Sequence, residues 1–283
     1  MKNRNKNLSF AAYPYVVWSA IFIVIPLLLI VFFSFTSKVD GRFVFSFENF
    51  QRLFEPIYFT VFIRSIWLAV LSTVSCLILG YPIAYIISKL PIKRRNMLIL
   101  LFILPMWMNF LLRTYAWMAI LGRDGLINTL LGYIGIGPIK MLYTDGAILL
   151  GMVYNFLPFM VIPIYTVLIK IDKNLVNAAY DLGANKAQAF RKIILPLSIP
   201  GIISGITMVF MPAVSNFVIP SLLGGGKYML VGNLIEQQFT TIGNWNFGSA
   251  LSIFMMILIL IPIALIVPIT VATTEAITAI KTV

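Results

Sequence analysis

Six long apolar stretches dominate this chain of 283 residues and decide what it can fold into. A helix needs about 20 residues, at about 1.5 Å each, to cross about 30 Å of hydrocarbon. The composition is 60% hydrophobic and only 11% charged, whereas soluble domains carry about 25% charged residues. The sequence therefore predicts an all-α membrane protein with six transmembrane helices in one domain, residues 1–283. The predicted spans are approximately residues 15–35, 62–88, 97–121, 147–169, 193–222 and 249–271.

Basic residues are divided unevenly between the connections that join these stretches. The N-terminus, the second and fourth connections and the C-terminal tail together carry 13 of the 21 Lys and Arg residues, and the other connections carry 6. By the positive-inside rule, the lysine- and arginine-rich side faces the cytoplasm. We therefore expect both termini and the fourth connection, residues 172–192, to be cytoplasmic. The net charge of +12 then reflects topology, and no nucleic-acid partner is expected.

The chain lacks residues that several classes of activity require. The chain has no histidine and one cysteine, Cys76, and none of the six stretches contains an acidic residue. A disulfide is excluded, and a zinc or iron site is not expected. The glycine-lysine cluster at residues 224–228 lacks the spacing of a phosphate-binding loop. We expect no cofactor on this chain and no catalysis by it, although a channel that needs no ATPase, or a membrane-embedded enzyme, stays as an alternative of another class.

The fourth connection is a polar segment of about 20 residues between two spans. Asp172 or Asn174 can cap a helix over residues 175–182, and Gly183 suits the left-handed position that ends a helix. A second short helix is predicted at residues 186–192. One interpretation is an amphipathic helix lying on the inner leaflet, but that design needs a large apolar face. The small residues Ala179 and Gly183 share a face instead, which favours close docking of a protein partner.

The segment also carries a recognisable spacing. Asn177-Ala178-Ala179, then Gly183, and nine residues later Ile193-x-Leu195-Pro196 resemble the EAA loop of ABC importer permeases, with asparagine in place of the leading glutamate. The resemblance implies the type I, MetI-like permease fold in a bacterial inner membrane. It also implies a coupling helix that fits a groove of a cytoplasmic ATPase, and it assigns ATPase coupling to Asn177, Ala178, Ala179, Asp181, Gly183, Leu195 and Pro196.

The same resemblance implies a set of partners. These are a second permease subunit, two ATPase subunits that hold ATP and Mg, an external substrate-binding protein, and membrane lipid. Further blocks are similar to the spermidine and putrescine branch of the family, namely residues 113–117, 125–128, 217–225, 232–235 and 245–248. They imply polyamine import, with another small polar solute on the same machinery as the alternative.

A cationic solute needs a path through spans that lack carboxylates. Aromatic faces and amides can pass a cation without trapping it, although aromatic side chains in spans more often serve packing. The interval Pro212–Pro220 interrupts the fifth span, and interruptions of this kind often line cavities. The two span arginines, Arg64 and Arg113, are expected to snorkel outward or to tie loops together. The pathway candidates are Trp107, Asn109, Tyr115, Tyr154, Asn155, Ser215 and Asn216.

Overall fold

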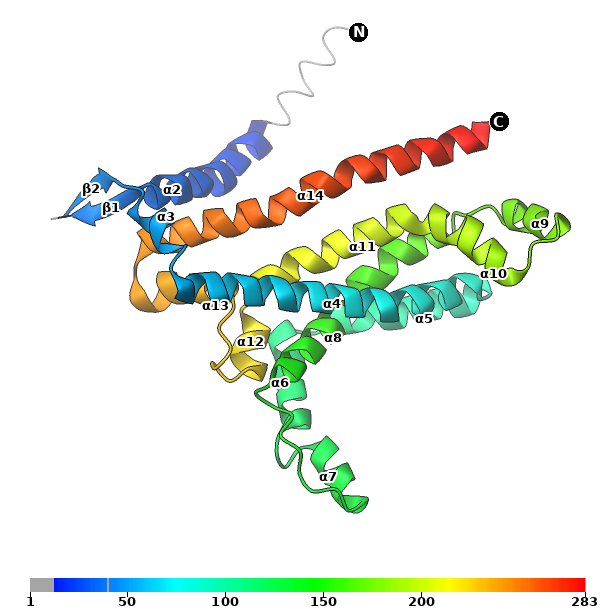
Figure 1. Cartoon of the computed structure of the whole chain (residues 1–283), viewed down its shortest axis with the longest axis horizontal. Coiled ribbons are helices and arrows are strands. Elements are labelled where there is room, and N and C mark those ends of the chain that lie inside the picture. The colour runs from blue at the N-terminus through cyan, green and yellow to red at the C-terminus, as the bar shows by residue number, and fades with distance from the viewer. Residues whose placement is uncertain (1–12, 40, 283) are drawn as a thin grey trace, which may run out of the picture. The chain divides into compact units, whose positions relative to one another are not determined.

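The computed structural model describes residues 13–39 and 41–282 and is mostly helical (Figure 1). Two short strands, β1 (Thr36–Val39) and β2 (Arg42–Phe45), form an antiparallel hairpin that the sequence did not predict. Three π-helical turns cover Ala20–Val24, Phe190–Ile194 and Gln238–Ile242. The α-helices are α2 (Ile25–Ser34), α3 (Glu48–Arg52), α4 (Pro56–Lys89), α5 (Ile92–Trp107), α6 (Phe110–Leu121), α7 (Leu126–Tyr133), α8 (Asp145–Leu168), α9 (Lys173–Asp181), α10 (Lys186–Ala189), α11 (Leu195–Ser215), α12 (Val218–Leu223), α13 (Val231–Gln237) and α14 (Trp245–Thr282).

Five helices in the described part of the chain are long and apolar enough to cross a membrane. A sixth span results if the bent pair Ile92–Trp107 and Phe110–Tyr133 counts as one. The all-α membrane class is confirmed. The five straight candidates are Tyr13–Ser34, Pro56–Lys89, Asp145–Leu168, Lys186–Ser215 and Trp245–Ala264.

The third predicted span, residues 97–121, is not one continuous helix. The chain bends by 93° between α5 and α6, after Pro105 in the last turn of α5 and an extended Met108 with ψ of 148°. Asn109 then starts α6, since its Oδ1 accepts hydrogen bonds from the backbone N–H groups of Leu111 at 2.8 Å and Leu112 at 3.4 Å. A side-chain cap within an apolar run has ended one helix and begun another.

The fifth predicted span, residues 193–222, differs at both ends. The helix begins at Lys186 and runs without a break to Ser215, so a separate short helix at residues 186–192 was wrong. At the other end Asn216 is extended, with ψ of 129°, and its Oδ1 accepts the Ile219 N–H at 2.9 Å. The predicted interruption between Pro212 and Pro220 is confirmed, and residues 218–223 form the separate helix α12.

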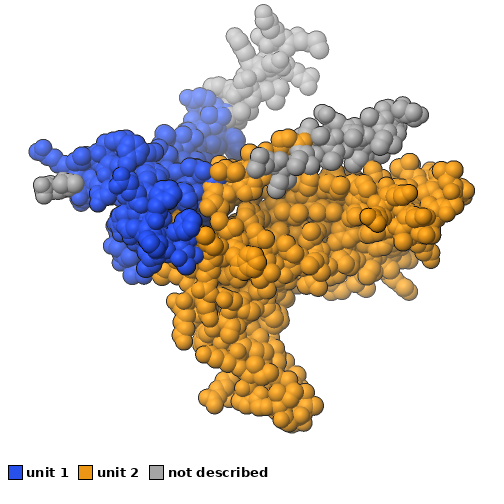
Figure 2. Space-filling model, viewed as in Figure 1, with its two compact units in different colours: residues 1–60, 234–257 blue, residues 61–233, 258–283 orange. Residues whose placement is uncertain are grey.

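The chain divides into two compact units (Figure 2). The first comprises residues 1–60 and 234–257. Within its described part, the hairpin is fixed by two amide side chains that both donate to the Thr36 carbonyl, Asn49 at 2.9 Å and Asn246 at 2.7 Å. Asn246 also donates to the Phe33 carbonyl at 3.1 Å. These bonds join the end of α2, the hairpin and the start of α14.

The second unit comprises residues 61–233 and 258–283, with α8 at its centre. Small residues let neighbouring helices approach α8 closely, which is how helices associate within membranes. A Cβ atom on Gly205 of α11 would lie 2.7 Å from the Met160 sulfur, and one on Gly201 would lie 3.0 Å from the Pro163 carbonyl oxygen. A Cβ on Gly80 of α4 would lie 3.0 Å from Met160 Cγ. α8 is therefore held between α4 and α11 at van der Waals distance.

Candidate functional site

Residues 172–192, which the sequence predicts to couple to an ATPase and which are called the coupling segment below, begin with a well-defined helix start. Asp172 takes an extended backbone conformation, and its Oδ1 accepts the Asn174 N–H at 2.9 Å. This satisfies one of the free N–H groups at the start of α9 and places a carboxylate at the positive end of the helix dipole. Of the two caps that the sequence allowed, the structure uses Asp172.

Gly183 ends α9 in the left-handed conformation that the sequence predicted. Its φ is +85°. The Gly183 N–H donates to the Tyr180 carbonyl at 2.9 Å, and the Ala184 N–H donates to the Ala179 carbonyl at 2.9 Å. These two bonds form the Schellman arrangement, which satisfies the last carbonyls of a helix and requires a left-handed residue. A Cβ on Gly183 would meet no atom within 4 Å, so its conformation, and not crowding, demands glycine.

The second half of the segment is continuous with α11. Asn185 and Gln188 form a capping box, in which each side chain accepts the backbone N–H of the other, at 2.9 and 2.8 Å. The Phe190 ring packs edge-on against the rings of Tyr81 and Tyr85 of α4, at 5.9 and 5.3 Å between centroids. The residues from Lys186 onward therefore form one rigid rod with α11 and are anchored on α4.

A second anchor lies one turn into α11. The hydroxyl groups of Tyr81 and Ser198 are 3.0 Å apart, and Ser198 donates in turn to the Leu195 carbonyl at 2.7 Å. Ser198 is fully buried. The segment from Lys186 onward is thus tied to α4 by both the Phe190 ring and the Ser198 hydroxyl.

The predicted coupling residues fall into two groups. Asn177, Ala178, Asp181 and Gly183 are exposed, and Ala179 is half-buried. Leu195 and Pro196 lie in the first turn of α11, half-buried and exposed respectively, so the structure does not bring these two onto the open surface of α9.

Leu182 is a surface residue that the sequence reasoning missed. It caps the C-terminus of α9 and is 89% exposed. Its side chain lies beside the small residues Ala178 and Gly183, which are also exposed. Its position directly before a helix-ending glycine was the signal that could have identified it.

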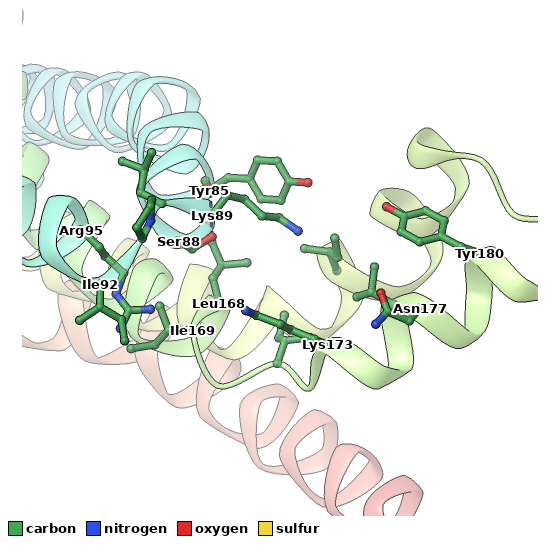
Figure 3. Close-up of a pocket in the computed structure, with 15 residues that line it drawn as sticks. Tyr85, Ser88, Lys89, Ile92, Arg95, Leu168, Ile169, Lys173, Asn177 and Tyr180 are labelled. Atoms are coloured by element: carbon green, nitrogen blue, oxygen red, sulfur yellow. Dashed lines mark hydrogen bonds between the residues drawn. The ribbon is translucent and has the colours of Figure 1, made fainter.

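Asn177 and Tyr180 face a second feature, on the other side of α9. Figure 3 shows them at the wall of a cavity of about 580 Å³, opposite the end of α4 and the start of α5. Because its residues come from three separate parts of the chain, sequence spacing alone gave no sign of it.

The seven pathway candidates do not form a single cluster of interacting side chains. Their hydrogen bonds are to backbone groups within four residues: Asn155 donates to Gly151 at 2.9 Å, and Ser215 donates to Met211 at 3.2 Å. Asn109 and Asn216 act as the helix caps described above. Asn155 is buried, and its Oδ1 has no hydrogen-bond partner among the described residues. The amide groups of Asn109 and Asn216 therefore lie at the two helix breaks.

The aromatic candidates are more open. Trp107 is 76% exposed at the end of α5, and Tyr115 is exposed on α6. Tyr154 of α8 packs against Trp117 of α6, with ring centroids 5.3 Å apart and a T-shaped geometry. Trp107 and Tyr115 thus have free ring surface, whereas part of Tyr154 is used for packing.

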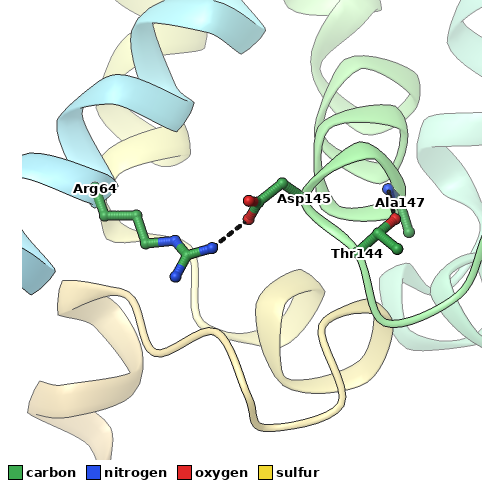
Figure 4. Close-up of polar contacts among 4 residues, drawn as sticks. All are labelled: Arg64, Thr144, Asp145 and Ala147. Atoms are coloured by element: carbon green, nitrogen blue, oxygen red, sulfur yellow. Dashed lines mark hydrogen bonds and ion pairs between the residues drawn. The ribbon is translucent and has the colours of Figure 1, made fainter.

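The two span arginines differ from each other. Arg64 forms an ion pair with Asp145, with 2.6 Å between Nη2 and Oδ1 (Figure 4), and its guanidinium lies 4.3 Å from the Tyr228 ring centre. It ties α4 to the start of α8, as expected. Arg113 is only 8% exposed, and its Nε has no hydrogen-bond partner among the described residues. Its guanidinium lies 5.9 Å from the ring centre of Phe110 in the same helix.

Comparison with known proteins shows the family to which the chain belongs. Residues 77–275 match the family described as "Binding-protein-dependent transport system inner membrane component". The chain is 42% identical to the spermidine/putrescine transport system permease protein PotB of Salmonella typhimurium, over 91% of each chain. It is 43% identical to the PotB protein of Escherichia coli, over 85% of this chain and 89% of that one. This chain therefore belongs to the family of binding-protein-dependent transport system inner membrane components.

Two further similarities agree with this membership. The inner membrane ABC transporter permease protein YdcU of Escherichia coli is 30% identical over 83% of this chain and 79% of that one. A crystal structure of a bacterial ABC transporter involved in alginate import matches with a TM-score of 0.82, at 18% identity, over 95% of this chain and 96% of that one. The fold is therefore that of an ABC importer permease, and this inner membrane component is a multi-pass protein.

Proposed function

We propose that this chain is a permease subunit of an ATP-driven importer for spermidine and putrescine, and that it forms one half of the translocation pore. The observation that carries the proposal is its 42–43% identity to PotB proteins over most of both chains. The partners are a second permease subunit, two ATPase subunits that hold ATP and Mg, and a substrate-binding protein. This chain itself binds no cofactor and hydrolyses no ATP.

The coupling segment is the part that receives the ATPase. Its exposed face combines small residues with the open Leu182 side chain, and a flat face with one apolar projection suits a groove. The continuous helix from Lys186 to Ser215 then carries the movement. Because Gly201 and Gly205 place α11 against the backbone of α8, a shift of α11 cannot be absorbed by side chains alone. ATPase closure therefore moves the spans that flank the pore.

The orientation follows the distribution of charge. With the lysine- and arginine-rich connections in the cytoplasm, the coupling segment and both termini lie on the ATPase side. The substrate-binding protein then meets the opposite side, which carries the first, third and fifth connections of the chain.

A polyamine would cross spans with few charges. Within the five straight spans the only acidic residue is Asp145, which pairs with Arg64. The exposed rings of Trp107 and Tyr115 and the amide of Asn216 can attract an ammonium group weakly. Weak attraction suits passage, and selection of the solute then rests with the binding protein.

Uptake of labelled spermidine tests the solute. Cells that lack this chain should lose uptake, and cells that carry it again should regain it. Unchanged spermidine uptake together with loss of uptake of another solute would assign the chain to that solute instead.

A pair of glycine substitutions tests the docking role. Gly183→Arg places a bulky cation on the exposed face of the coupling segment, so recovery of the ATPase on pull-down should be lost while membrane insertion stays normal. Gly135→Arg is the matched control, because Gly135 also has a positive φ, of +78°, and open space around it. Normal ATPase recovery with Gly183→Arg would refute docking at this face.

A further inference from the structure

The cavity behind α9 has an unusual charge balance. Its lining includes three cationic side chains, Lys89, Arg95 and Lys173, and none of the described residues that line it is acidic. Lys89 comes from the end of α4, Arg95 from the first turns of α5, and Lys173 from the start of α9 (Figure 3). Three like charges around one cavity of about 580 Å³ repel one another unless an anion lies between them.

One cation of this basic cavity, Arg95, has a buried nitrogen without a hydrogen-bond acceptor among the described residues. The Arg95 Nε is buried and has no hydrogen-bond partner in the part of the chain that the structure describes. A buried donor left without an acceptor is costly, and more so when it belongs to a charged group. The Lys89 ammonium lies over the Tyr85 ring, at 5.3 Å from its centre. The nearby Asp172 carboxylate caps α9 and is not part of the lining.

Asn177 affects the net charge of the cavity lining. It lines the cavity at the position where the EAA spacing has glutamate. A carboxylate there would offset one of the three positive charges, whereas the asparagine amide is neutral and can donate a hydrogen bond. The substitution therefore leaves the cavity more attractive to an anion from outside the chain.

Apart from Ser88 and the tyrosines Tyr85 and Tyr180, the remaining wall of the cavity is apolar, and this narrows the class of anion that fits it. The cavity lies where α4 and α8 end, so it opens at the level at which a span meets the lipid headgroups. Basic pockets between membrane helices are suited to acidic headgroups, with the acyl chains along the apolar wall. The apolar lining residues are Leu90, Ile92, Leu168, Ile169, Ile171, Val176 and Ile194.

We propose that the basic cavity binds the phosphate of an anionic phospholipid, held between Lys89, Arg95 and Lys173. A lipid in this place joins the turn between α4 and α5 to the coupling helix α9. Its headgroup would replace the missing carboxylate of position 177. The proposal rests on the cavity alone and does not depend on the solute or on the ATPase.

Lipid retention by the full chain, purified with the subunits that accompany it, tests the proposal. Native mass spectrometry would follow the binding of phosphatidylglycerol, phosphatidylcholine and inorganic phosphate. We expect one phosphatidylglycerol site that phosphatidylcholine does not fill and inorganic phosphate does not displace. Arg95→Gln and Lys173→Gln should each weaken phosphatidylglycerol binding about fivefold, the size expected for one basic residue near an anionic lipid. Asn177→Glu should weaken it to a similar extent by adding a negative charge.

Two controls keep the result interpretable. Arg94→Gln removes a neighbouring exposed cation that does not line the cavity, and it should leave binding unchanged. Arg95→Lys keeps the charge and should retain most of the binding, which separates loss of charge from misfolding. The proposal fails if Arg95→Gln and Arg94→Gln behave alike. It also fails if phosphatidylcholine binds equally well, if inorganic phosphate displaces the lipid, or if an acidic side chain of a partner subunit fills the cavity in the assembled complex.

Discussion

The left-handed glycine at the end of α9 gives the sharpest quantitative test of the coupling segment. With φ of +85° and no atom within 4 Å of the place a Cβ would take, Gly183→Ala should be penalised by backbone conformation alone. Other L-residues in the left-handed region cost about 1–2 kcal/mol, which corresponds to about 5- to 30-fold in a local opening equilibrium. Gly183→Asn should cost less, because asparagine tolerates this region.

Hydrogen exchange measures this penalty where it acts. The Gly183 and Ala184 N–H groups close the turn by bonding to the Tyr180 and Ala179 carbonyls, so their exchange should accelerate by that factor in Gly183→Ala and by less in Gly183→Asn. Gly132→Ala is the matched control: Gly132 lies in α7 with open space around it and without a positive φ. There alanine should be neutral or stabilising. Equal exchange rates of the N–H groups at positions 183 and 184 in Gly183→Ala and Gly132→Ala would refute the conformational argument.

Two further predictions concern packing and orientation. Gly205→Leu should lower the thermal stability of the protein, because a Cβ at this position would lie 2.7 Å from the Met160 sulfur. Ser204→Leu, at the exposed neighbouring position, should change the stability little. Equal melting temperatures of the two variants would argue against close packing of α11 on α8. In Lys227→Cys and Arg94→Cys variants, a membrane-impermeant thiol reagent added outside the cell should label position 227 and not position 94, and the reverse pattern would overturn the proposed orientation.

The sequence predicted the spanning helices because their evidence is local. Length and hydropathy of each run were enough for the membrane class, and Gly183, a residue suited to the left-handed conformation, was enough to find the turn that ends α9. Helix breaks depend on one side chain each, and the sequence predicted only one of the two. The cap at Asn109 lies in an apolar run, where a window of average hydropathy does not register a single amide. The break at Asn216 was found only because prolines stand on either side of it.

Contacts between residues that are distant in the sequence could not be predicted from it. The basic cavity combines Lys89, Arg95 and Asn177, which belong to different helices, and no spacing in the sequence relates them. The Arg64–Asp145 ion pair joins residues 81 positions apart. The resemblance to the EAA loop named Leu195 and Pro196 together with residues of α9, and the structure has these two in the first turn of α11, within the predicted fifth span of residues 193–222.

The π-helical turn at residues 190–194 lets this helix hold one residue more without a change in the direction it faces. Its Leu195 N–H bonds to the Phe190 carbonyl, five residues earlier, so the turn holds one residue more than an α-helix would. Deleting a single residue here would let the turn close as an ordinary α-helix and keep the rod intact. Because the extra residue lies within a single turn, this deletion would leave the helix before it facing nearly the same way. A deletion in the α-helix that follows would instead rotate everything before it by about 100° around the axis, since an α-helix has 3.6 residues per turn. A single-residue deletion within residues 190–194 therefore keeps the direction in which the coupling segment faces, whereas one in the α-helix that follows changes it.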